Sequence, residues 1–319
     1  MGLTRRGQVL FSMTLLFALL SIVSFMTINV QTDWEFILQH RGKRLLAMLL
    51  VAIAMGLATI AFQTITHSRI LTPSLMGFDV LYMLVHSVGL TLWGAKSGLN
   101  GAPELRLLLE VVTMVAIALI LFQLLFNRSI RGLHVLILLG LVGGIFFREL
   151  AELALRITDP TEFSIQSANS LASFNRINLS LLWLGFGGVI LCAAVLVILR
   201  RSLDILSLGR DVAINLGVPY NKIVTLVMAA ICILISISTA LVGPMLFFGL
   251  VVANLAYWLT GTHLHRWTFP TSILAGIICL VGGQVIFEQV LHSSLPLAMT
   301  IELVGGVLFI MLLLRGIKQ

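Results

Sequence analysis

The stretch that decides the fold runs from Ile223 to Leu259 and reads IVTLVMAAICILISISTALVGPMLFFGLVVANLAYWL. It carries no charged residue, and only Gly243-Pro244 interrupts its apolar character. A single helix of this length would extend about 55 Å at about 1.5 Å per residue, whereas the hydrocarbon core of a bilayer is about 30 Å thick. Gly-Pro is a strong helix-break signal. We therefore predict two membrane crossings here, the second of them short.

The rest of the chain has the same character. Of its 319 residues, 59% are hydrophobic and only 10% are charged, whereas soluble domains carry about 25% charged residues. The predicted fold class is therefore an all-α polytopic membrane protein with a single transmembrane domain over residues 1–319. The ten candidate crossings are residues 9–30, 45–63, 74–93, 107–126, 133–155, 179–199, 223–242, 245–260, 271–291 and 299–315. The first is longer than a signal-peptide core, so we interpret it as an uncleaved helix.

The loop charges indicate the orientation of the chain. Ten crossings put both termini on one side of the membrane, and that side holds more of the Lys and Arg residues in the connecting segments. Cytoplasmic loops carry such an excess, so we expect both termini in the cytoplasm. The net charge of +7 is thus mainly a topology signal. Because no basic soluble face is present, nucleic-acid binding is excluded, and the lipid bilayer is the expected environment.

The longest interior loop, about residues 200–222, contains the polar stretch LDILSLGRDVAINLGVPYNK. Leu208, Val212 and Leu216 repeat at the spacing of one helix face. Gly217 followed by Pro219 is typical of a helix end, because glycine supplies a left-handed cap and proline prevents continuation. The pattern predicts one or two short helices with defined ends, lying outside the bilayer.

Two interpretations of this segment follow from the residues. It could lie on lipid headgroups, as interfacial helices do when their polar face is rich in Lys and Arg. Its polar face is instead nearly balanced, with Arg210 beside Asp211. A compact, capped and charge-balanced helix is better suited to a cleft in another protein, so we favour a docking role.

Other polar residues allow two interpretations each. Arg41, Lys43 and Arg44 lie just before the second predicted helix on the outer side, where they are either an interfacial anchor or a docking site for an acidic partner surface. Neutral polar groups inside the crossings could line a translocation path or join helices. They are Gln63, Asn254 and Gln284.

The charged and metal-capable residues suggest structural roles. Asp79 stands near a helix start, where an acid suits the positive end of the helix dipole. Glu110 and Glu288 are expected to reach water near helix ends. His263 and His265 in the sequence THLHR are expected to be solvated in an interior loop rather than to bind a metal. Three cysteines lie inside crossings without zinc or disulfide spacing, namely Cys192, Cys232 and Cys279. We predict no metal site.

Several stretches together resemble the permease subunits of ABC importers for ferric siderophores, haem and cobalamin. They are RGKRLLAMLLVAIAMGLATIAFQTIT (41–66), SRILTPSLMGFDVLY (68–82), LGRDVAINLGV (208–218), LVGPMLFFGLVVANLAYWLTGTHLHR (241–266) and SLPLAMTIELVGGVLFIMLLLR (294–315). The resemblance covers nearly the whole chain and is closest to the catecholate-siderophore branch. Ala253-Asn254 and Tyr257 replace the family's Pro-His and Arg, and Gln284 and Glu288 replace an Asp and an Arg, which puts cobalamin transport in doubt.

The resemblance implies a cobalamin-importer-like (type II) permease in the bacterial inner membrane. It implies four partners: an ATP-binding subunit, a second permease chain (identical or paralogous), a periplasmic or lipid-anchored binding protein, and a ferric siderophore as cargo. It assigns ATPase coupling to Gly209, Arg210, Asp211, Asn215, Leu216 and Gly217. No phosphate-binding loop of the form G-x-x-x-x-G-K-[ST] occurs in the sequence, so ATP would be used by the partner, and we expect this chain to bind no cofactor.

Two rival functions fit the residues less well. An ion-coupled secondary transporter of a small organic solute is the main alternative, although such proteins carry midplane acids and paired broken helices, whereas here the acids lie near helix ends. An intramembrane enzyme is disfavoured because neither H-E-x-x-H nor G-x-S-x-G is present.

Overall fold

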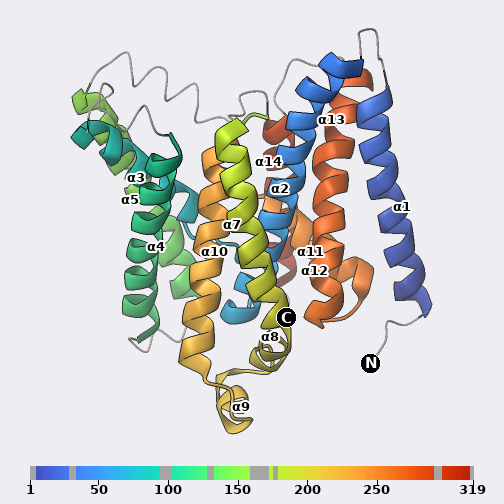
Figure 1. The fold of residues 1–319 in the computed structure, drawn as a ribbon. Coiled ribbons are helices and arrows are strands. Elements are labelled where there is room, and N and C mark those ends of the chain that lie inside the picture. Colours follow the sequence, from blue (N-terminus) through green and yellow to red (C-terminus); the bar gives the residue numbers. More distant parts are fainter. Residues whose placement is uncertain are drawn as a thin grey trace.

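The computed structural model describes residues 5–28, 34–93, 103–127, 133–158, 172–174, 179–290 and 297–316, and these are helical apart from short turns (Figure 1). The all-α prediction is confirmed for this part of the chain. The long helices are α1 (Arg5–Thr27), α2 (Trp34–Thr66), α3 (Phe78–Trp93), α4 (Pro103–Asn127), α5 (Leu133–Thr158), α7 (Leu179–Ile198), α10 (Tyr220–Val242), α11 (Phe248–Thr260), α12 (His265–Ile277) and α14 (Leu297–Gly316). Shorter elements are α8 (Arg200–Leu206), α9 (Arg210–Asn215), η2 (Ile278–Gly282), α13 (Gly283–Val285) and η3 (Ile286–Val290).

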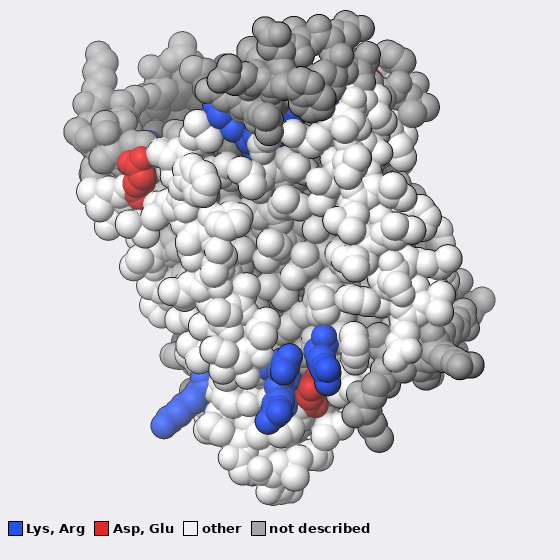
Figure 2. All heavy atoms as spheres, turned by 45° about the vertical axis from the view of Figure 1, so that its right-hand side comes forward, with Lys and Arg blue, Asp and Glu red and all other residues white. Residues whose placement is uncertain are grey.

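Each predicted crossing corresponds to one of the long helices, with α12 continued by η2, α13 and η3. Within the described residues, five helices are long and apolar enough to cross a membrane: Gly7–Thr27, His40–Thr66, Leu179–Ile198, Tyr220–Val242 and His265–Glu288. Three shorter apolar helices accompany them: Phe78–Gly89, Phe248–Thr260 and Leu297–Leu312. On the face drawn in Figure 2, charged side chains gather toward the two ends of the molecule and leave a broad uncharged band between them. This band is what a lipid-facing surface requires.

The break at Gly243-Pro244 is confirmed. Helix α10 ends at Val242, and Gly243 has φ +103°, in the region that favours glycine. The site is also crowded, because a Cβ on Gly243 would lie 3.0 Å from the Cα of Ala172. Helix α11 then begins at Phe248 and has only 13 residues, about 20 Å at about 1.5 Å per residue. The second crossing is therefore short, as the sequence predicts.

Two predicted boundaries are wrong. Helix α2 begins at Trp34, well before residue 45, so the basic cluster at 41–44 lies inside the helix rather than ahead of it. Helix α12 begins at His265 and contains Pro270, whereas the prediction started at 271. In both cases the first turns of the helix contain polar residues. A prediction based on hydrophobicity leaves such residues out, although the helix continues through them.

Helix α2 occupies the centre of the bundle and packs against α10, α12, α7 and α11. Its buried face is rich in alanine, whose small side chain allows close helix approach. Glycines act in the same way where helices meet. A Cβ on Gly185 of α7 would lie 2.9 Å from Ile237 Cγ2 of α10, whereas a Cβ on Gly187 would meet nothing within 4 Å. Gly185 therefore allows α7 to pack closely on α10, whereas Gly187 faces away from the neighbouring helices.

This contrast gives a paired test on one helix. Gly185→Leu should lower the thermal unfolding midpoint of the purified protein, because overpacking a close contact costs about 1–3 kcal/mol. Gly187→Leu adds the same side chain toward open space and should leave the midpoint close to that of the wild type. Equal midpoints for the two variants, measured in the same detergent, would contradict the packing of α7 on α10.

Candidate functional site

The predicted interior loop folds as two short helices, α8 and α9, and α9 projects beyond the end of the bundle (Figure 1). Helix α1 begins and α14 ends at this same end of the bundle. Ala213 is fully buried on the inner side of α9. The apolar stripe predicted from the spacing faces outward: the exposed fractions are 62% for Leu208, 44% for Val212 and 59% for Leu216. Ile214, at 49%, extends the same surface. We call these four residues the α9 knob.

Glycines define both ends of α9. Gly209 precedes the helix with φ +110°, and Gly217 follows it with φ +79°. At the second end the Val218 N–H donates to the Ala213 carbonyl at 3.0 Å, and the Gly217 N–H donates to the Ile214 carbonyl at 2.9 Å. This is the Schellman arrangement that satisfies the last carbonyls of a helix. The predicted left-handed cap at Gly217 is confirmed, and the knob therefore has a defined shape.

The polar face of α9 is exposed to solvent. Arg210, Asp211 and Asn215 all have exposed side chains. The guanidinium of Arg210 lies 5.6 Å from the centroid of the Tyr220 ring at the start of α10, within the range of a cation–π contact. Asp211 lies in the first turn of α9, where an acid suits the helix dipole. The structure gives α9 its own charge-balanced surface; the assignment of these residues to ATPase coupling stays a prediction.

On the inner side, α8 is attached to the bundle through Asp204. Its Oδ1 accepts from His265 Nδ1 at 2.6 Å and from the His265 backbone N–H at 2.8 Å. On the other edge of the ring, His265 Nε2 lies 2.8 Å from Thr64 Oγ1 of α2. His265 is only 1% exposed, so the expectation of a solvated histidine is wrong.

Asp204 is a residue of this contact that no sequence pattern singles out. Partial burial tends to raise the pKa of this carboxyl, but the hydrogen bonds from the His265 side chain and backbone, with the charges of His265 and Arg200, hold its pKa below the ordinary value. A carboxylate is therefore present here at neutral pH. The available signal was weak: an acid between two apolar residues, Leu203 and Leu206, on a short helix whose buried face they form.

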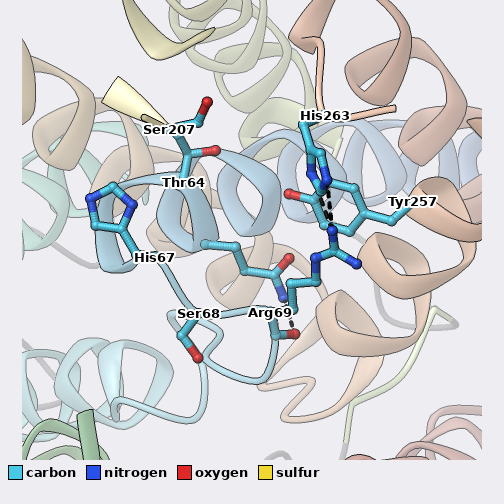
Figure 3. A pocket seen from close by; sticks show the side chains of 8 residues that line it. Thr64, His67, Ser68, Arg69, Ser207, Tyr257 and His263 are labelled. Carbon is cyan, nitrogen blue, oxygen red and sulfur yellow. Dashed lines mark hydrogen bonds between the residues drawn. The ribbon is translucent and has the colours of Figure 1, made fainter. Parts of the chain in front are cut away.

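A small recess lies beside this contact, with a cavity volume of about 190 Å³ (Figure 3). Arg69 lies between two aromatic groups there: its Nη2 is 2.8 Å from His263 Nε2, and its guanidinium is 5.1 Å from the centroid of the Tyr257 ring. Burial, with the charges of Arg69 and His265, lowers the pKa of His263, so this ring is neutral at pH 7 and can accept from Arg69. The lining residues are Gln63, Thr64, His67, Ser68, Arg69, Ser207, Tyr257 and His263.

The three residues predicted to line a path are not brought together. Gln63 lies at the recess, where its Nε2 donates to the Arg69 carbonyl at 2.8 Å. Asn254 donates to the Leu250 carbonyl of its own helix at 2.8 Å. Gln284 belongs to α13, which lies near the opposite end of the bundle (Figure 1), and it donates to Glu288 Oε1 at 2.9 Å. All three contacts are local, made within one helix or with the turn that follows it, and both the path and the helix-joining interpretations stay predictions.

The outer basic cluster makes contacts within the chain. Arg44 Nη2 lies 2.6 Å from Glu288 Oε1, which links α2 to η3. Arg41 Nη1 donates to the carbonyls of Phe25 at 3.1 Å and Ile28 at 2.7 Å, which links α2 to α1. Both side chains, like that of Lys43, remain partly exposed. The anchor and docking interpretations therefore gain a third role, the joining of helices at the outer end.

Two acids are buried inside the bundle, although Glu110 was expected to reach water. Glu110 is 3% exposed rather than in contact with water, and it accepts hydrogen bonds from Tyr82 and His86 of α3 and from Arg106 of its own helix, each at 2.9 Å. Asp79 lies in the first turn of α3, as predicted, but it is 1% exposed and accepts from Thr239 Oγ1 at 3.3 Å. Packing of α3 on α4 and α10 buries both carboxyls beside donors.

The metal-capable residues stay apart in the described part of the chain. No group of three His, Cys, Asp or Glu side chains there is placed to hold a metal ion. The three cysteines are free; Cys192 and Cys232 are buried, and Cys279 is partly exposed.

The bundle of apolar helices and the projecting α9 knob define a multi-pass membrane protein with an exposed apolar surface at one end. The chain belongs to the FecCD transport family, which matches residues 7–315. It is 38% identical to the Petrobactin import system permease protein YclO of Bacillus subtilis (strain 168), over 90% of this chain and 91% of that protein. It is 32% identical to the Petrobactin import system permease protein FatC of Bacillus anthracis, over 88% of this chain and 79% of that protein.

A solved structure has the same fold. It is described as an inward-facing conformation of a metal-chelate type ABC transporter, with a TM-score of 0.77 and 23% identity, and the match covers 97% of this chain and 99% of that one. The predicted architecture, an ABC importer permease of about ten membrane helices, is confirmed by this likeness and by the family.

The left-handed cap can be tested by substitution. Gly217→Val should destabilise the end of α9, because a left-handed conformation costs a β-branched residue at least about 1 kcal/mol. The amide protons of Gly217 and Val218 that close the helix should then exchange faster with solvent, as measured by hydrogen–deuterium exchange. Gly217→Asn is the matched control, since asparagine tolerates this conformation. Unchanged exchange in the valine variant would contradict the cap.

Proposed function

We propose that this chain is the permease subunit of an ATP-driven ABC importer that carries a ferric siderophore into the cytoplasm. The observation that carries the proposal is the α9 knob, an exposed apolar surface of defined shape at one end of a membrane bundle. Membership of the FecCD transport family supports it. The relatives named as petrobactin import permeases support a ferric siderophore rather than cobalamin as the cargo.

In this proposal the α9 knob docks into a cleft of the ATP-binding subunit. Burying a Leu, Ile or Val side chain fully is worth about 1.5–3 kcal/mol, so four partly exposed ones supply several kcal/mol of binding free energy. Arg210, Asp211 and Asn215 surround the knob with polar contacts that orient the partner. Gly209 and Gly217 hold the knob as a rigid unit, which lets hydrolysis in the partner act on this chain as a push.

The remaining partners follow from the same arrangement. A second permease chain, identical or paralogous, would complete the translocation path. A periplasmic or lipid-anchored binding protein would deliver the siderophore at the end opposite α9, where Arg41, Lys43 and Arg44 offer positive charge to an acidic surface. The iron stays chelated by its siderophore, and this chain binds no cofactor of its own; ATP is bound by the partner.

The proposed site is the inner membrane of a bacterium, with both termini in the cytoplasm. Two observations support this orientation. The start of α1 and the end of α14 lie at the same end of the bundle as α9 (Figure 1). In this proposal the ATP-binding subunit docks at that end. The positive-inside distribution of Lys and Arg in the sequence agrees.

The proposal is tested with the complete transporter in proteoliposomes. Val212→Glu places a charge in the knob and should reduce both the co-purified ATP-binding subunit and ATP-driven uptake of a ferric siderophore by about tenfold or more, since a loss of about 1.4 kcal/mol weakens binding tenfold. Leu216→Met keeps the surface apolar and should retain both. Full assembly and uptake in the Val212→Glu variant, or uptake driven by a proton gradient without ATP, would contradict the proposal.

A further inference from the structure

His265 joins three helices that are far apart in the sequence. It begins α12, and its side chain contacts α8 through Asp204 and α2 through Thr64. We propose that His265 is a positioning residue of transport: together with Asp204 and Thr64 it passes the movement of the α8–α9 segment to the transmembrane helices α12 and α2. This inference rests on the proposed function and names the contact through which coupling is transmitted.

The Asp204 side of the contact is directional. One carboxylate oxygen accepts from both the ring and the backbone N–H of His265, at 2.6 and 2.8 Å. Leu264 at the cap position of α12 makes no side-chain cap of its own, so Asp204 supplies the acceptor for the first turn from another helix. An acid in this place also interacts favourably with the positive helix end. Two bonds to a single residue hold both the distance and the angle between α8 and α12.

The Thr64 side extends the contact to the central helix. Thr64 lies in the last turn of α2 and is 7% exposed, and its Oγ1 is within reach of the Ile60 carbonyl at 2.9 Å as well as of His265 Nε2. Asp204 requires a proton on Nδ1, because an ionised carboxylate only accepts. Nε2 can then donate to Thr64 as part of an imidazolium, or accept from Thr64 as a neutral ring. The contact with α2 is kept in either protonation state.

Packing holds the imidazole in place for these contacts. Phe269, one turn along α12, meets the His265 ring at a centroid distance of 5.0 Å and an interplanar angle of 68°. With the ring 1% exposed, water does not compete for its two nitrogens. Burial of such a group stabilises a structure only when its hydrogen bonds are made, so the three residues keep one relative arrangement.

The other contacts of α8 are of a different kind. Leu203 and Leu206 are 0% and 1% exposed, and α8 packs on α2, α12 and α9. Apolar contacts resist separation of α8 from the bundle but are not directional, so they permit sliding. The hydrogen bonds of His265 fix the register. A push on the α9 knob therefore moves α2 and α12 only while this contact is intact.

A purely structural role predicts something different. If His265 served only to stabilise the fold, its loss would lower ATP hydrolysis and uptake in proportion, through a smaller amount of active protein. As a positioning residue, its loss lowers the number of siderophore molecules imported per ATP hydrolysed, while the ATP-binding subunit remains docked on α9. The ratio of uptake to hydrolysis therefore distinguishes the two roles.

The experiment uses the complete transporter in proteoliposomes, with uptake of a ferric siderophore and ATP hydrolysis measured on the same vesicles. Asp204→Ala and His265→Ala should lower the uptake per ATP by about tenfold, as expected for loss of a hydrogen bond to a charged group. Asp204→Asn is the matched control: its amide oxygen can still accept both bonds from His265, but without the negative charge that strengthens them, so its ratio should lie between those of Asp204→Ala and the wild type. His263→Ala, two residues away and exposed, controls for the removal of an imidazole.

The double variant Asp204→Ala/His265→Ala should be no worse than either single variant, because both remove the same contact. An unchanged ratio in the alanine variants, a proportional fall of uptake and hydrolysis, or an Asp204→Asn variant as impaired as Asp204→Ala would each overturn the inference. Failure of the proposed function gives a different result, namely that the ATP-binding subunit stays bound and active when the knob is charged by Val212→Glu.

Discussion

The pairing of backbone polar groups inside hydrocarbon is the constraint on which this structure depends. A membrane offers no water to an unpaired N–H or C=O, so an apolar chain of this kind crosses it as helices. Every departure from regular helix must then lie near an end or be protected by packing. The break at Gly243-Pro244 meets the second condition, since its backbone lies against Ala172. The α8–α9 segment meets the first by lying at one end of the bundle.

The same absence of water controls the polar side chains. A buried charge is costly unless a partner satisfies it, and in this bundle several of the partners come from other helices. Arg44 of α2 pairs with Glu288 of η3. Glu110 of α4 accepts hydrogen bonds from side chains of α3. Asp204 of α8 accepts from His265 of α12. Hydrophobic packing among lipid-like surfaces is weakly selective, whereas these hydrogen bonds fix which helix lies beside which, and at what register.

This division of roles suits a protein that must move as a few rigid pieces. Rigid-body motion of packed elements is a common route to switching between states. The apolar contacts of α8 hold the α8–α9 segment on the bundle, and the hydrogen bonds of His265 fix its position relative to α12 and α2. The α9 knob, closed by its glycine caps, adds a surface on which a partner can act without deforming the helix. In the proposed mechanism, coupling depends on this small polar contact between apolar layers.

The sequence alone determined what depends on neighbours along the chain. The ten apolar segments, the break at Gly243-Pro244 and the left-handed end at Gly217 are all local consequences of composition and of allowed backbone angles. The tertiary structure alone decided the burial of Glu110 and the pairing of His265 with Asp204, residues 61 positions apart in the sequence. A charged or imidazole side chain carries no local signal of its partner, because the free energy that buries it comes from the packing of distant helices.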